Sequence, residues 1–223
     1  MKFICILCFT FLNTFVFAQK QSWDSTYRPG SYELRVGHFK SYPNHKKDII
    51  FLGNSISLGT EWQELLQNKR VRNRGISGDI TFGIIERLKE ITEGHPKKVF
   101  ILIGINDIAR NIPDDVIVNN YKRIIQQIKI ESPRTKIYFQ TLLPVNNEYT
   151  DRNQFNKDNH IQNVNAKLVQ LASEENIYLI DLHPHFLNEN KKLDKQYTYD
   201  GLHLNAEGYK KWASILINGK YLK

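Results

Sequence analysis

The sequence contains almost no cysteine. Only two of its 223 residues are cysteines, Cys5 and Cys8, and both lie within the first eighteen residues. A chain from which that segment is removed has no thiol, which excludes disulfides, thiolate nucleophiles and cysteine metal sites. The stability of such a chain depends on its hydrophobic core, without help from disulfides. The remaining stretch of about 205 residues is long enough for one domain with a sizeable core.

The first eighteen residues have the pattern of an export signal. Lys2 precedes the apolar stretch from Phe3 to Phe17, and the small residue Ala18 comes just before polar residues. This order predicts a signal peptide at residues 1–18 and export to the periplasm or the extracellular space. The stretch is short for a transmembrane anchor, which needs about 20 apolar residues. A large residue, Leu7, before Cys8 disfavours a lipoprotein anchor. We therefore expect no stable membrane insertion after cleavage.

The chain also lacks charge runs, internal repeats and low-complexity tracts. Its formal net charge of +8 favours partners such as nucleic acid, anionic lipid or acidic glycans. However, the basic residues are scattered among acidic ones, and the densest group is Arg70, Arg72 and Arg74. That distribution is typical of a solvated exterior. No nucleic-acid-binding motif is present, so nucleic acid is not an expected partner.

What the chain does contain is a regular alternation of apolar runs and amphipathic stretches. Apolar runs predict strands at Asp48–Leu52, Val71–Asn73, Lys98–Ile103, Lys136–Leu142 and Ile177–Leu182. Helical spacing predicts helices at Thr60–Gln67, Thr81–Thr92, Pro113–Ile130, Asp158–Glu174 and Asn205–Ile217. This alternation indicates an α/β fold of flavodoxin-like size, with a five-stranded parallel sheet covered on both faces.

The domain organisation follows from where the strands begin. Residues 48–223 form one predicted domain, and residues 19–47 form an N-terminal extension with an amphipathic helix at Tyr32–Phe39. We expect this extension to pack on the domain. The polar stretch Asn146–Asn159 is predicted to be a long surface loop.

Four short segments follow strands or precede the last helix, where the ligands of such sheets bind. They are Gly53–Ser57, Gly75–Asp79, Gly104–Asp107 and Asp200–His203. Each has a simpler interpretation as a turn or a helix cap. Together they indicate one functional crevice, because a single sheet edge would gather all four.

These segments contain the groups that acyl transfer requires. Ser55, on a turn at the end of a strand, is the candidate nucleophile. His203 is the candidate base, since imidazole titrates near neutral pH. Asp200 lies three residues earlier on the same loop, a spacing that lets its carboxylate hold the Nδ1 proton while Nε2 faces Ser55. The candidate oxyanion donors are the backbone N–H groups of Ser55 and Gly78 and the side-chain amide of Asn106.

The segments FLGNSIS, NRGISGD, GIND and DGLHLNAEGY resemble, in order, the sequence blocks of the SGNH hydrolases, the GDSL-type esterases. The resemblance covers about Ile49 to Trp212 and implies a three-layer α/β/α sandwich. It assigns Ser55, Gly78, Asn106 and His203 to the block residues, with Asp200 as the family's aspartate. Asn54 replaces the aspartate of the usual GDS. Forms with GNSI are similar to a secreted subgroup associated with acetylated sugars, including sialate O-acetylesterases.

Other residues are weaker candidates. Arg74 and Arg110 lie next to the blocks and have the donors to bind a carboxylated sugar, although a surface ion pair is the more ordinary role. Asn146 is a candidate pocket residue. His183 and His185 lack a further set of ligands, so we predict no metal site. No cofactor is implied.

Three functions remain open at this stage. The favoured one is hydrolysis of acetyl esters on carbohydrate, so the expected partner is a small-molecule or glycan ester. A lipid-directed esterase, such as a lysophospholipase or a platelet-activating-factor acetylhydrolase, is the first alternative, although no apolar lid is evident. The second is an inactive glycan-binding protein, which would not need Ser55, Asp200 and His203 together. No feature of the sequence indicates an oligomeric state.

Overall fold

The computed structural model describes residues 23–149 and 151–223. The predicted signal peptide and both cysteines lie outside these residues, as do residues 19–22 of the predicted extension. Among the described helices, none combines the length and the apolar character needed to cross a membrane.

The core is one parallel sheet of five strands, as predicted. The strands are β1 (Ile49–Gly53), β2 (Val71–Gly75), β3 (Lys98–Leu102), β4 (Lys136–Gln140) and β5 (Tyr178–Ile180). They pair in the order β2-β1-β3-β4-β5. Every residue of β1 and β3 is buried, which explains why both read as unbroken apolar runs.

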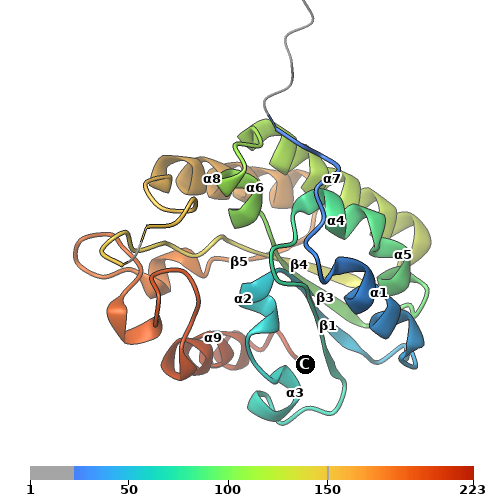
Figure 1. Cartoon of the computed structure of the whole chain (residues 1–223). Helices are drawn as coiled ribbons and strands as arrows, with labels where there is room; N and C mark the ends of the chain where they lie inside the picture. The colour runs from blue at the N-terminus through green and yellow to red at the C-terminus, as the bar shows by residue number, and fades with distance from the viewer. Residues whose placement is uncertain (1–22, 150) are drawn as a thin grey trace, which may run out of the picture.

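Helices cover both faces of this sheet and complete three layers (Figure 1). In Figure 1, α7 (Asp114–Glu131) and α8 (Asp158–Glu174) lie on one side, and α3 (Trp62–Leu65) and α9 (Ala206–Asn218) lie on the other. The predicted helix Thr81–Thr92 is divided into α4 (Thr81–Glu86) and α5 (Leu88–Thr92). Two short helices that the sequence did not predict, α2 (Ser55–Leu58) and α6 (Ile105–Ala109), directly follow β1 and β3.

The strand order places three loop starts side by side. Because β1 lies between β2 and β3, the order reverses at β1, and crevices form at such reversal points. Gly53, the last residue of β1, pairs with both Gly75 of β2 and Leu102 of β3. The segments that follow the three strands therefore leave the sheet at the same level.

The described part of the N-terminal extension packs on the domain. Helix α1 (Tyr32–Ser41) buries Tyr32, Val36 and Phe39 in a small cluster with Ile76, which follows β2. Ahead of α1, Trp23 stacks on Phe82 of α4 with ring centroids 5.7 Å apart.

Candidate active site

Ser55 is the first residue of α2, immediately after β1. Asn54 caps this helix, because its side-chain oxygen accepts a hydrogen bond from the Ile56 N–H at 2.9 Å. Gly75 is needed beneath the turn, since a Cβ there would lie 2.4 Å from the Leu58 nitrogen and 2.8 Å from the Asn54 oxygen. The Ser55 N–H, at a helix N-terminus, has no acceptor within the helix.

Three side chains from other elements hold α2 in place. The hydroxyl of Tyr209 donates to the Ile56 carbonyl at 2.9 Å, and the Trp62 indole N–H donates to the Ser57 carbonyl at 2.7 Å. The Asn73 amide donates to the Leu58 carbonyl at 3.1 Å. These bonds satisfy carbonyls that a helix of four residues leaves free, so the turn that carries Ser55 is anchored on several sides.

The structure joins Ser55, His203 and Asp200 in one chain of hydrogen bonds. Ser55 Oγ lies 2.9 Å from His203 Nε2, and His203 Nδ1 lies 2.7 Å from Asp200 Oδ2. The other Asp200 oxygen accepts the backbone N–H groups of Leu202 and His203 at 3.0 and 2.7 Å. Partial burial raises the pKa of Asp200, but the hydrogen bonds from His203 and Leu202 outweigh it and hold the pKa below its ordinary value of 3.8.

The loop around His203 is fixed by local contacts. The Thr198 hydroxyl donates to the His203 carbonyl at 2.6 Å and accepts from the Gly201 N–H at 2.9 Å. The exposed ring of Tyr199 stacks on the imidazole with centroids 6.0 Å apart. A residue outside the predicted set also reaches this loop, because Arg152 donates to Asp200 Oδ2 at 2.8 Å.

The other predicted donors lie in the segments after β2 and β3. Gly78 has a φ of +79°, which favours glycine, and its N–H makes no hydrogen bond within residues 23–149 and 151–223. The Asn106 amide nitrogen donates one hydrogen to the Asp79 carbonyl at 3.0 Å, which leaves its second hydrogen available. Asn106 Oδ1 accepts from Gln154 at 3.2 Å, so the direction of the amide is fixed from both ends.

Buried charged side chains stabilise the segments that carry these donors. Asp79 and Arg87 form a fully buried ion pair at 3.0 Å, and Arg87 also donates to the carbonyls of Gly53 and Arg74. Burial raises the pKa of Asp79, and the Arg87 guanidinium opposes that rise. Asp107 accepts both the N–H and the hydroxyl of Thr81, at 3.0 and 2.5 Å. Burial raises the pKa of Asp107 to about 7, against the lowering effect of these bonds.

A cavity of about 480 Å³ adjoins the donors. Gly78 and Asn106 form one side of it, and Trp23 and Tyr27 form another. Its remaining lining residues are Asp24, Ala109, Arg110, Asn153 and Gln154. Volumes of this order are usual for small-molecule sites.

Comparisons with known proteins identify the family. Residues 51–211 match the family described as GDSL-like lipase/acylhydrolase. The chain belongs to this family. It is therefore a carboxylic-ester hydrolase, which is the activity that the family's description gives.

The relatives of this acylhydrolase differ in what their names say they act on. Human platelet-activating factor acetylhydrolase IB subunit alpha2 is 29% identical over 175 residues, which cover 74% of this chain and 72% of that protein. A Streptococcus pneumonia structure provisionally described as a platelet activating factor is 31% identical, with a TM-score of 0.76, and the match covers 86% of this chain and 92% of that one. An acetyl xylan esterase, AlAXEase, shares the fold with a TM-score of 0.65 at 23% identity, covering 77% and 98% of the two chains.

Two of the weaker candidates in the acylhydrolase do not line the cavity. Arg74 is buried and forms an ion pair with Glu90 at 2.7 Å, under the ring of Phe39. Asn146 is also buried, and its amide binds the Leu193 carbonyl and the Glu148 N–H. Expecting either side chain in the pocket was wrong, because each already has internal partners. Arg110, in contrast, is exposed and lines the cavity.

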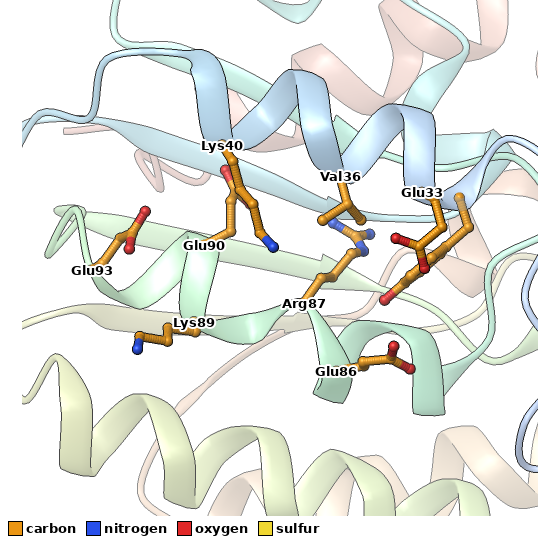
Figure 2. A pocket seen from close by; sticks show the side chains of 9 residues that line it. Glu33, Val36, Lys40, Glu86, Arg87, Lys89, Glu90 and Glu93 are labelled. Atoms are coloured by element: carbon orange, nitrogen blue, oxygen red, sulfur yellow. The ribbon is translucent and has the colours of Figure 1, made fainter.

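A second cavity, of about 590 Å³, lies under α1 and contains none of the predicted site residues. Figure 2 shows Glu33, Val36 and Lys40 extending from α1 above Arg87 and Glu90. The lining of this cavity includes Arg87 and Glu90, which form the buried ion pairs with Asp79 and Arg74, respectively.

The histidines of the acylhydrolase's DLHPHF segment take no shared role. His183 Nδ1 lies 2.8 Å from the Leu142 carbonyl, and His185 is exposed. Within the described parts of the chain, no three His, Cys, Asp or Glu residues are grouped so as to hold a metal ion.

The sequence did not predict several residues that shape the site. Trp23 and Tyr27 had a signal, namely two aromatic residues in an otherwise polar stretch before the predicted domain. No feature of the sequence distinguished Arg152 and Gln154, because they lie in a polar loop whose path depends on the fold. Asp107 was visible as part of GIND, but its bonds to Thr81 depend on tertiary packing.

Proposed function

We propose that this acylhydrolase is an exported serine esterase that removes acetyl groups from O-acetylated carbohydrate, with acetylated sialic acid among its substrates. The observation that carries the proposal is the continuous chain of hydrogen bonds from Ser55 Oγ through His203 to Asp200, together with a Gly78 N–H that has no partner among the described residues. A nucleophile, a base, a group that orients the base and oxyanion donors are the parts that acyl transfer requires.

The reaction proceeds in two halves. His203 Nε2 takes the Ser55 proton as Oγ attacks the acetyl carbonyl, and the oxyanion is bound by the N–H groups of Ser55 and Gly78 and by Asn106. The bond between the acetyl carbon and the sugar oxygen then breaks as His203 gives its proton to that oxygen, so the sugar leaves as an alcohol and acetyl-Ser55 remains. Water, deprotonated by His203, attacks this ester, and acetate leaves as Ser55 regains its proton.

Asp200 acts through His203. As the acceptor of the Nδ1 proton, it holds the tautomer in which Nε2 is free to take a proton, and it stabilises the imidazolium that forms. Its low pKa keeps it ionised over the range in which an imidazole titrates.

Two observations support a small acyl group. The proteins named platelet-activating factor acetylhydrolase and acetyl xylan esterase, both similar to this chain, act on acetyl groups according to their names. Among the described residues that line the cavity beside Gly78, Ala109 is the only aliphatic one, so a long acyl chain would find few aliphatic partners there. The GNSI form of the first block, with Asn54, supports the sialate assignment by its resemblance to that subgroup.

The nucleophile is tested by Ser55→Ala. We expect an unchanged unfolding transition and loss of at least about 10⁴-fold in kcat for p-nitrophenyl acetate, because the acyl-enzyme cannot form. Ser214→Ala, an exposed serine on α9, serves as the matched control and should retain full activity. Retention of full activity in Ser55→Ala would contradict the assignment.

A second candidate is a lipid-directed esterase, which the curated acetylhydrolase relatives favour. Product detection on acetylated sialic acids, acetylated xylan oligomers, lysophospholipids and platelet-activating factor separates the two. Faster release from the lipids, or faster turnover of octanoyl than acetyl esters, would reject the carbohydrate proposal. Binding of the sugars without hydrolysis of any ester would favour the inactive glycan-binding alternative.

Export is tested directly. Expression of the full chain followed by intact mass measurement of the protein outside the cytoplasm should give the mass of residues 19–223. A mass that retains residues 1–18 would contradict the proposed cleavage after Ala18.

A further inference from the structure

One wall of the cavity beside the oxyanion donors comes from the segment that precedes α1. Trp23 and Tyr27 both line it, although they lie more than fifty residues from Gly78 in the sequence. Stacking on Phe82 of α4 holds the Trp23 ring. The Arg110 guanidinium, which also lines the cavity, lies over the Tyr27 ring in a cation–π contact.

The chemistry of this lining is that of a sugar site. Aromatic faces bind the C–H faces of a pyranose, and side-chain amides and a guanidinium bind its hydroxyls. Both kinds of group are present, with the rings of Trp23 and Tyr27 beside Asn153, Gln154 and Arg110. A lipid chain would need aliphatic neighbours, and among the lining residues that the structure describes only Ala109 is aliphatic.

Arg110 keeps its donors available. Within residues 23–149 and 151–223, no hydrogen bond or ion pair involves its guanidinium, and the side chain is exposed. The nearby Asp24 carboxylate is already engaged, since it accepts both the N–H and the hydroxyl of Thr26 at 2.7 Å.

We propose that Trp23, Tyr27 and Arg110 form the subsite for the sugar ring of the substrate, which rests on the proposed deacetylase activity. An acetyl ester has only a methyl on its acyl side. The group that fills a cavity of this size is therefore the alcohol part, which would lie among Trp23, Tyr27 and Arg110 beside the oxyanion donors Gly78 and Asn106. The segment before α1 thus sets which sugars this enzyme accepts.

The test compares kcat/KM for O-acetylated sialic acid and an O-acetylated xyloside with that for methyl acetate, by acetate release from the full-length protein. In Trp23→Ala, the ratio of sugar ester to methyl acetate should fall about tenfold through a higher KM, and Trp23→Phe should restore most of it. Arg110→Ala should lower the ratio for the acidic sugar more than for the neutral one.

Tyr42→Ala is the control, because this exposed aromatic follows α1 and does not line the cavity. Its ratio should match that of the wild type. Thermal unfolding of each variant separates loss of the subsite from loss of the fold. An unchanged ratio in a folded Trp23→Ala protein that still deacetylates both sugars would overturn the subsite and leave the proposed function intact. A wild-type protein that releases acetate from neither sugar would instead overturn the proposed function.

Discussion

The two loops that meet at Ser55 are built in different ways. The oxyanion loop, Gly75 to Thr81, is supported by buried charges, namely the Asp79–Arg87 pair and the Asp107 carboxylate on Thr81. The base loop, Thr198 to His203, is held by hydrogen bonds of the Thr198 hydroxyl and of the Asp200 carboxylate, and the Arg152–Asp200 pair at its edge is partly exposed.

This difference indicates which substitutions should affect the stability of the protein and which should affect its activity. A buried charge that loses its partner has no water to replace it, so breaking one member of a buried pair is strongly destabilising. An exposed pair is screened by solvent and salt and contributes little. We therefore expect substitutions of the buried residues that support the oxyanion loop to lower the free energy of unfolding. Substitutions at the exposed edge of the base loop should lower activity, and only weakly.

The largest expected effect is that of Arg87→Ala. It removes the partner of Asp79 and the donors to the Gly53 and Arg74 carbonyls, so the free energy of unfolding should fall by about 3–5 kcal/mol. Urea unfolding measures this loss. The paired variant Arg87→Met with Asp79→Asn, which removes both charges, should recover part of it. A loss below about 1 kcal/mol in the single variant would show that the comparison of the two loops is wrong.

Much of this architecture is visible in the sequence. Continuous apolar runs mark β1 and β3 because both faces of the sheet are covered, and α8 has the predicted bounds, Asp158–Glu174, because apolar residues recur at helical spacing from Ile161 to Ala172. Helices α2 and α6, of four and five residues, are too short to show a periodicity.

Side-chain partners were harder to predict than elements. Arg74 and Arg110 both adjoin a sequence block, yet one is buried against Glu90 and the other lies exposed on Tyr27. Nothing local distinguishes them, because the partners come from α5 and from the segment before α1. In the same way, Gln154 reaches Asn106 across 48 residues of sequence.

An intermediate effect concerns pH. The folded chain binds a proton at Asp107 up to about pH 7, whereas the unfolded carboxyl loses it near 3.8. Between these values the folded state holds the extra proton, so this group's contribution to stability is present at low pH and is lost as pH rises. The slope is at most about 1.4 kcal/mol per pH unit.

Asp107→Asn isolates this contribution. The variant is neutral at every pH, so the stability of the wild type relative to the variant should decrease as pH rises from about 4 to 7. Urea titrations at several pH values give this difference, and other groups, such as Asp200, cancel in it. A difference that stays constant over this range would mean that Asp107 is ionised throughout.

The smallest expected effect is that of Arg152→Ala, on the base loop. Asp200 keeps its bonds to His203 and to the backbone N–H of Leu202, so the carboxylate remains oriented without the arginine. The exposed pair contributes at most about 1 kcal/mol, which limits the fall in kcat/KM for p-nitrophenyl acetate to about fivefold. The fall should shrink as sodium chloride is raised, because salt screens the lost charge. Lys210→Ala, which removes another exposed pair, with Glu207, is the control and should leave kcat/KM unchanged. A loss of a hundredfold or more, independent of salt, would place Arg152 with the buried supports of the oxyanion loop and remove the distinction between the two loops.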